Sequence, residues 1–134
     1  MKKQVLVIDS SKAIRFLLQT VLGDHCRVIA ASDVFSGMFW LSKKNLPDLI
    51  IVDPYVDGVY QWDLVEQLTS SGIYGDIPVM VLSSLSMEET RLKCDELGVS
   101  NFFLKPFNPL DLLKSVNVVL AKKKLVIENR LISI

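Results

Sequence analysis

The sequence predicts a three-layer α/β domain, with a five-stranded parallel sheet covered by helices on both faces. Five short apolar runs occur along the 134-residue chain, and runs without polar alternation are typical of strands buried on both faces. Longer segments between them carry apolar residues at helical spacing. Strands that alternate with helices join through right-handed crossovers, which place helices on both sides of a parallel sheet.

Each element has its own signal in the sequence. The predicted strands are the apolar runs Val5–Ile8, Val28–Ala31, Leu49–Val52, Val79–Leu82 and Phe102–Leu104. The predicted helices are the segments Lys12–Leu22, Val34–Ser42, Gln61–Leu68, Met87–Leu97 and a last helix from Pro109 through Leu120. Asp33 and Asn108 are expected to cap the helices that follow them, because short polar side chains accept the first free amides of a helix.

Residues 122–134 form a tail that we separate from the domain at residues 1–121. Apolar residues such as Val116, Leu120 and Ile127 keep a helical period across the lysines at 122–124. The β-branched residues of the tail favour a strand instead. Three outcomes therefore stay open: a longer last helix, an added strand, or a contact in a homodimer that buries the apolar side chains.

Composition excludes several classes of function. Lys plus Arg equals Asp plus Glu, 15 against 15, whereas a nucleic-acid binder needs excess positive charge. Cys26 and Cys94 have no metal-binding or disulfide-framework spacing, so we expect reduced thiols packed in the core. The first apolar stretch stops at Asp9, too early for a signal peptide or a membrane span. We expect a cytoplasmic protein that binds neither nucleic acid nor a membrane.

Polar side chains follow four of the predicted strands: Asp9, Asp53, Ser83 and Lys105. A parallel sheet brings these strand ends to one rim, where ligands and chemistry gather. Two neighbouring carboxylates repel unless a cation neutralises them, and Mg²⁺ binds to one or two carboxylates while keeping positions for water and phosphate oxygens. Together with an ammonium group and a hydroxyl, this set suits phosphoryl transfer, in which a carboxylate can be the nucleophile.

The chain resembles the receiver domains of two-component response regulators. The matching stretches follow the family's order and spacing: VLVIDSSKAIR (Val5–Arg15), PDLIIVD (Pro47–Asp53), IPVMVLSS (Ile77–Ser84) and GVSNFFLKPFNPLDLL (Gly98–Leu113). The resemblance covers roughly residues 4–121. It implies a flavodoxin-like (βα)5 fold, a cis peptide between Lys105 and Pro106, and a place in phosphorelay signal transduction.

The resemblance also implies an acceptor and a metal site. Asp53 matches the phosphoacceptor, and Asp9 matches one of the acidic residues that hold Mg²⁺ with it. The backbone carbonyl of Tyr55 would be a further ligand. Ser10 stands where the family usually has a second acidic residue, commonly a direct metal ligand. A serine hydroxyl is a poorer ligand than a carboxylate, so we expect a weak Mg²⁺ site in which Ser10 binds weakly or through water.

Three further residues match the family's catalytic and switch positions. Ser83 matches the switch serine or threonine, and Lys105 matches the lysine that contacts the phosphoryl group. Phe102 matches the aromatic switch residue, although a plain core role suits it equally well. Phosphorylation is expected to draw Ser83 toward the phosphoryl group and turn Phe102 inward. The surface made by Ser86–Leu97 and Phe102–Ala121 would then meet a downstream partner.

The loop after Asp53 departs from the family pattern. It reads PYVDGVYQW, and its Asp57-Gly58 pair is well suited to a turn. The alternative is that Asp57 partly replaces the carboxylate that is missing at Ser10.

Three classes of function remain to be separated. The leading one is a phosphorylatable switch that receives its phosphoryl group from a histidine kinase or a phosphotransfer protein. Such a domain is not an enzyme in the ordinary sense and at most catalyses its own phosphorylation and dephosphorylation. The second is a pseudo-receiver, a binding module independent of phosphorylation, which Ser10 favours. The third is an α/β enzyme or flavin carrier, but the loop DSSKA lacks the glycine that close phosphate binding usually needs.

Overall fold

The central sheet has the five parallel strands that the sequence predicts. A computed structural model describes the backbone of residues 2–56 and 58–132, and side chains as far as residue 122. The strand order is β2-β1-β3-β6-β7. The strands are β1 (Lys3–Ile8), β2 (Cys26–Ala31), β3 (Leu49–Val52), β6 (Val79–Ser83) and β7 (Asn101–Leu104). The order reverses direction between β1 and β3, which is where ligand sites of open α/β sheets form.

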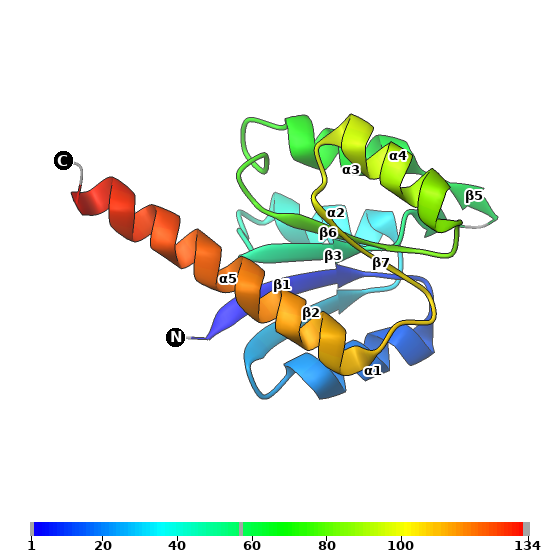
Figure 1. Ribbon diagram of the computed structural model, residues 1–134, viewed down its shortest axis with the longest axis horizontal. Coiled ribbons are helices and arrows are strands. Elements are labelled where there is room, and N and C mark those ends of the chain that lie inside the picture. Colours follow the sequence, from blue (N-terminus) through cyan, green and yellow to red (C-terminus); the bar gives the residue numbers. More distant parts are fainter. Residues whose placement is uncertain (1, 57, 133–134) are drawn as a thin grey trace.

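The helices cover both faces of the sheet, as expected (Figure 1). They are α1 (Lys12–Leu22), α2 (Val34–Ser42), α3 (Trp62–Ser70), α4 (Met87–Leu97) and α5 (Pro109–Ile132). One core packs α1 and α5 against the sheet, with Leu18 and Val116 among its buried residues. The other core packs α2, α3 and α4 against the opposite face, with Leu41 and Leu68 among its members. The three-layer flavodoxin-like prediction is therefore confirmed.

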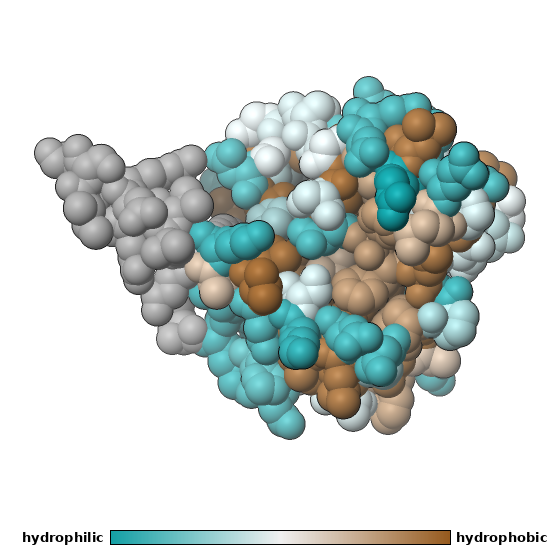
Figure 2. Space-filling view, viewed as in Figure 1, coloured by the Kyte–Doolittle hydropathy of each residue, from teal (hydrophilic) through white to brown (hydrophobic). Residues whose placement is uncertain are grey.

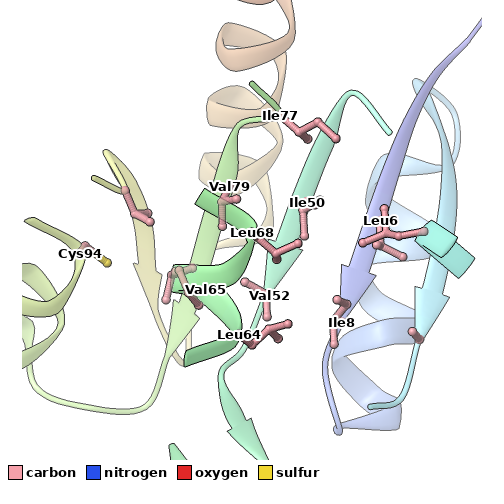
Figure 3. Close-up of a cluster of buried hydrophobic side chains, with 14 residues drawn as sticks. Leu6, Ile8, Ile50, Val52, Leu64, Val65, Leu68, Ile77, Val79 and Cys94 are labelled. Atoms are coloured by element: carbon pink, nitrogen blue, oxygen red, sulfur yellow. The ribbon is translucent and has the colours of Figure 1, made fainter. Parts of the chain in front are cut away.

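Alternate residues of β1 supply the two cores. Val5 and Val7 belong to the core under α1 and α5, whereas Leu6 and Ile8 belong to the core under α2, α3 and α4 (Figure 3). All four side chains are at most 1% exposed, and burial of such a side chain contributes about 1.5–3 kcal/mol. On α2, a Cβ on Gly37 would lie 2.6 Å from Ile8 Cδ1, so glycine allows this helix to approach the sheet closely.

Short polar side chains begin the helices that follow the strands. The Ser36 amide donates to Asp33 Oδ1 at 2.7 Å, and the Leu110 amide donates to Asn108 Oδ1 at 2.9 Å. Both predicted caps are thus confirmed. Ser11 and Ser86 cap α1 and α4 in the same way. These four caps favour the starts of α1, α2, α4 and α5, whereas α3 begins after Gln61 without a side-chain cap.

A small antiparallel hairpin after Asp53 was not predicted. It consists of β4 (Tyr55–Val56) and β5 (Val59–Tyr60). The Tyr55 and Tyr60 rings lie 5.0 Å apart, and Tyr60 stacks on Trp62 at 6.2 Å. Strands of two residues have no periodicity to detect in the sequence, so the hairpin is seen only in the antiparallel pairing and ring contacts of the structure. Asp57 lies outside the described residues, so both interpretations of its role stay untested.

The last helix is longer than the domain requires. The backbone of α5 continues as one helix through Ile132 (Figure 1). A contact of this segment with a second copy of the chain stays a prediction. Among the described residues, no helix is both long and apolar enough to cross a membrane.

Candidate functional site

Two buried carboxylates lie side by side at the carboxyl ends of the central strands. Asp9 follows β1 and Asp53 follows β3, and Ile8 pairs with Val52 in the register of these strands. The Asp53 amide donates to the Ile8 carbonyl at 2.9 Å, which extends the strand pairing by one residue to Asp53. Asp9 is 1% exposed and Asp53 is 4% exposed. Two neighbouring carboxylates repel each other unless a cation lies between them.

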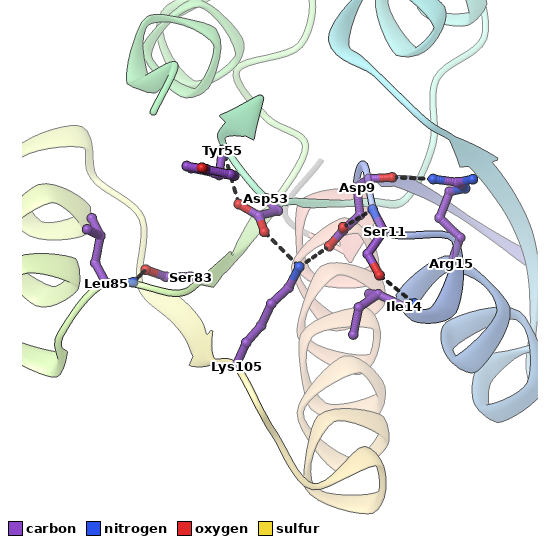
Figure 4. Close-up of polar contacts among 9 residues, drawn as sticks. All are labelled: Asp9, Ser11, Ile14, Arg15, Asp53, Tyr55, Ser83, Leu85 and Lys105. Atoms are coloured by element: carbon purple, nitrogen blue, oxygen red, sulfur yellow. Dashed lines mark hydrogen bonds and ion pairs between the residues drawn. The ribbon is translucent and has the colours of Figure 1, made fainter. Parts of the chain in front are cut away.

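Lys105 supplies that cation. Its Nζ lies 2.7 Å from Asp9 Oδ2 and 2.7 Å from Asp53 Oδ2, so one ammonium group bridges both carboxylates (Figure 4). Burial by itself would lower the pKa of Lys105, but its hydrogen bonds to Asp53 and Asp9 and their negative charges raise the pKa above its ordinary value. The Lys105–Pro106 peptide is cis, as the resemblance implies.

Each carboxylate is oriented by its own loop. The Ser11 amide donates to Asp9 Oδ1 at 2.9 Å, and the Tyr55 amide donates to Asp53 Oδ1 at 2.8 Å. This two-residue reach is the usual turn made by aspartate side chains. It leaves both Oδ2 atoms directed at Lys105. Asp9 does not cap α1, because the Ile14 amide donates to Ser11 Oγ instead.

The oxygen ligands at this site fit a divalent cation, although they are fewer than the family usually supplies. Asp9 Oδ2 is buried and, among the described residues, accepts no hydrogen bond besides its ion pair with Lys105. Two carboxylate oxygens that share one ammonium group could equally share Mg²⁺, which needs only one or two carboxylates. Ser10 is exposed and adds no charge. Accordingly, no group of three or more acidic, histidine or cysteine side chains in the described part of the chain could hold a metal.

Ser83 lies at the end of the neighbouring strand β6, but its hydroxyl is engaged elsewhere. Ser83 Oγ lies 2.8 Å from Thr90 Oγ1, and the Leu85 amide donates to it at 3.0 Å. Figure 4 shows this hydroxyl directed toward Leu85, on the side away from Lys105. Phe102, opposite Val81 in β7, is partly buried against the core. Ser83 therefore adjoins the acidic site through its backbone, since the Lys105 amide donates to the Ser83 carbonyl at 2.7 Å, while its hydroxyl bonds to Thr90 and Leu85.

Sequence reasoning missed two residues near this rim. Thr90 is fully buried on α4 and forms a hydrogen bond with Ser83. Its spacing of four residues from Cys94 would have indicated that both lie on the same, buried face of the helix. Tyr60 lies close enough to Asp53 to respond to its charge. Burial raises the pKa of Tyr60, the charges of Asp53 and Tyr55 raise it further, and hydrogen bonds with Ser84 oppose the rise.

The sequence over most of its length matches a known family. The family model of the response regulator receiver domain matches residues 5–117, and the chain belongs to that family. Receiver domains are signalling modules of two-component systems rather than classical enzymes. They interact with histidine kinases and downstream effectors, and they typically bind Mg²⁺ at the acidic pocket.

Similar proteins agree with this assignment. The chain is 28% identical over 123 residues to the phosphate regulon transcriptional regulatory protein PhoB of Escherichia coli, covering 91% of this chain and 53% of that protein. It is 24% identical over 118 residues to protein PilH of Pseudomonas aeruginosa, covering 88% of this chain and 98% of that protein. The chain spans about half the length of PhoB and 8% of hybrid signal transduction histidine kinase D of Dictyostelium discoideum.

Solved structures show the same architecture. The chemotaxis response regulator CheY4 of Vibrio cholerae superposes with a TM-score of 0.77 at 26% identity, covering 89% of this chain and 99% of that one. A CheY-like receiver domain protein of Methanospirillum hungatei superposes with a TM-score of 0.81 at 18% identity, covering 92% and 98%. The second likeness, at this identity, concerns the fold alone.

Proposed function

We propose that this chain is a phosphoryl-accepting switch in which Asp53 is the acceptor. The observation that supports this most strongly is the pair of 2.7 Å contacts from Lys105 Nζ to Asp53 Oδ2 and Asp9 Oδ2. The contacts put a nucleophilic oxygen, a cation and a second carboxylate within one ion-pair distance at the rim. Those are the components that phosphoryl transfer requires.

The transfer itself is a displacement at phosphorus. Asp53 Oδ2 attacks the phosphoryl group of a phosphohistidine on a histidine kinase or a phosphotransfer protein. The new O–P bond forms as the P–N bond breaks, and the imidazole nitrogen keeps the bonding electrons and takes up a proton. Lys105 then stabilises the negative charge on a phosphoryl oxygen. Mg²⁺ held by Asp9 and Asp53 would supply the remaining charge neutralisation, with the Tyr55 carbonyl and Ser10 as weaker ligands.

The conformational response to phosphorylation would involve the elements next to the acidic site. After transfer, Ser83 would donate to a phosphoryl oxygen and Phe102 would turn inward, which changes the surface of α4, β7 and α5. Apolar side chains are already exposed there, with Met87, Leu92 and Val118 each about half exposed or more. Figure 2 shows apolar residues gathered on this face of the molecule. Such a surface suits a downstream partner protein.

Acetyl phosphate tests the proposal directly, because it needs no cognate kinase. The protein is incubated with acetyl phosphate and Mg²⁺, and its intact mass is measured. We expect the added mass of one phosphoryl group in the unaltered chain and none in Asp53→Asn. A chain that never gains the group would overturn the proposal.

The second candidate is a pseudo-receiver that binds partners without phosphorylation. Ser10 favours it, because the acidic site has one carboxylate fewer than most of the family. The retained Asp53 and Lys105 oppose it, since their 2.7 Å ion pair preserves the acceptor chemistry. A phosphoryl-independent partner interaction, together with no mass change at any Mg²⁺ concentration, would decide for the pseudo-receiver.

A further inference from the structure

The switch serine and a threonine of α4 form a closed pair of hydroxyls. Ser83 Oγ and Thr90 Oγ1 are 2.8 Å apart, and both residues are 0% exposed. No solvent reaches either group, so each hydroxyl depends on protein partners. A buried hydroxyl that loses its partner destabilises the state in which the loss occurs.

The short connection between β6 and α4 fixes this pair in space. The Leu85 amide donates to Ser83 Oγ at 3.0 Å. Ser86 caps α4 by accepting from the Glu89 amide at 3.1 Å, and the Thr90 amide donates to the Ser86 carbonyl at 3.0 Å. Thr90 is thus held one helical turn after the cap, facing the end of β6. The Ser83 side chain is directed toward α4 and not toward Asp53.

We propose that Thr90 is a positioning residue that holds the switch serine in its resting direction until Asp53 is phosphorylated. The inference rests on the proposed function, because it assumes that Ser83 turns toward a phosphoryl group. In the switched state, Ser83 gains a charge-assisted hydrogen bond to a phosphoryl oxygen. Thr90 can then turn its hydroxyl to the Ser86 carbonyl four residues back, as helical threonines commonly do.

This exchange of partners predicts which state depends on the Thr90 hydroxyl. Only the resting state contains the Ser83–Thr90 hydrogen bond. Thr90→Val keeps the β-branched shape but removes the hydroxyl, so it weakens the resting state and leaves the switched state nearly unchanged. Binding of a phosphoryl analogue, which selects the switched state, should therefore tighten.

The test titrates beryllofluoride, a phosphoryl analogue, into the full chain at saturating Mg²⁺ and follows the amide resonances of Ser84 and Leu85. Thr90→Val should bind beryllofluoride about threefold to tenfold tighter than the unaltered chain, the ratio for one ordinary hydrogen bond. Thr90→Ser keeps a hydroxyl and should bind like the unaltered chain. Thr90→Ala serves as a second variant without the hydroxyl, and thermal unfolding checks that each variant is folded.

A double-mutant cycle separates positioning from general packing. In a Ser83→Ala background, Thr90→Val should leave beryllofluoride affinity unchanged, because the hydrogen bond is already absent. Equal affinity of Thr90→Val and the unaltered chain, or a tightening that persists in Ser83→Ala, overturns the positioning role. If the unaltered chain neither binds beryllofluoride nor gains a phosphoryl group from acetyl phosphate, the proposed function fails and this inference fails with it.

Discussion

The two halves of the rim are built from different interactions. At β1 and β3, Asp9 and Asp53 are charged and share the ammonium group of Lys105 at 2.7 Å. At β6 and α4, Ser83 and Thr90 are neutral hydroxyls that bond to each other away from solvent. We call these the charged half and the neutral half. In the proposed function, the charged half carries out the transfer as it stands, whereas the neutral half exchanges hydrogen-bond partners in order to respond.

The largest effect is expected in the charged half, from removal of its only ammonium group. Lys105→Met should slow phosphorylation by acetyl phosphate about a hundredfold, a typical loss when one charge-stabilising group is removed. Lys93→Met is the matched control, because Lys93 lies on the surface of α4 and pairs with Glu96, at 3.7 Å, outside the charged half. The rate of mass gain measures both variants. Equal rates would mean that the ammonium group has no part in transfer.

A smaller change is expected when the charged half regains a carboxylate. Ser10→Asp should raise Mg²⁺ affinity on the order of tenfold, since the affinity of such sites follows the charge of their ligands. Tryptophan fluorescence, to which Trp62 contributes beside Tyr60 and the hairpin after Asp53, reports the titration. Ser10→Asn changes size without adding charge and should leave affinity near that of the unaltered chain. Unchanged affinity in Ser10→Asp would exclude Ser10 as the weak point of the site.

The smallest effect, on stability at high pH, is expected at Cys94, which is buried on α4 four residues after Thr90. Burial and, to a lesser extent, the charge of Asp95 raise the pKa of this thiol to about 11. An unfolded thiol has a pKa of about 8.5, so the folded state disfavours the thiolate. Burial of the protonated Cys94 thiol therefore stabilises the fold fully below the pKa that the thiol has in the unfolded chain. This stabilisation is lost as pH rises through about 11.

Urea denaturation from about pH 8 to about pH 11, a range that spans the ordinary thiol pKa, measures this contribution. Cys94→Ala should be less stable at neutral pH because of the lost packing, but its stability should fall less steeply as pH rises. Parallel curves for the two proteins would show that Cys94 does not titrate in this range.

The sequence predicts the charged half far better than the neutral half. Asp9, Asp53 and Lys105 each follow an apolar strand, so a parallel sheet necessarily brings them to one rim. The bridging position of the ammonium group depends on the loop amides of Ser11 and Tyr55, which orient the carboxylates. No strand pattern contains that information.

The Ser83–Thr90 bond has no comparable sequence signal. It depends on the angle at which α4 leaves β6, and that angle follows from the Ser86 cap and the short loop before it. The hairpin of β4 and β5 was missed for a related reason. Its strands contain two residues each, and strand pairing together with contacts among aromatic rings forms it, without any repeat along the chain.

The Leu85 amide offers the most direct test of the difference between the two halves. In the resting state it donates to Ser83 Oγ at 3.0 Å, so its resonance reports where that hydroxyl is directed. Phosphorylation by acetyl phosphate should shift the Leu85 amide resonance in proportion to the phosphorylated fraction, and Asp53→Asn should show no shift. A phosphoryl group that accumulates on Asp53 while the Leu85 resonance stays in place would contradict the account.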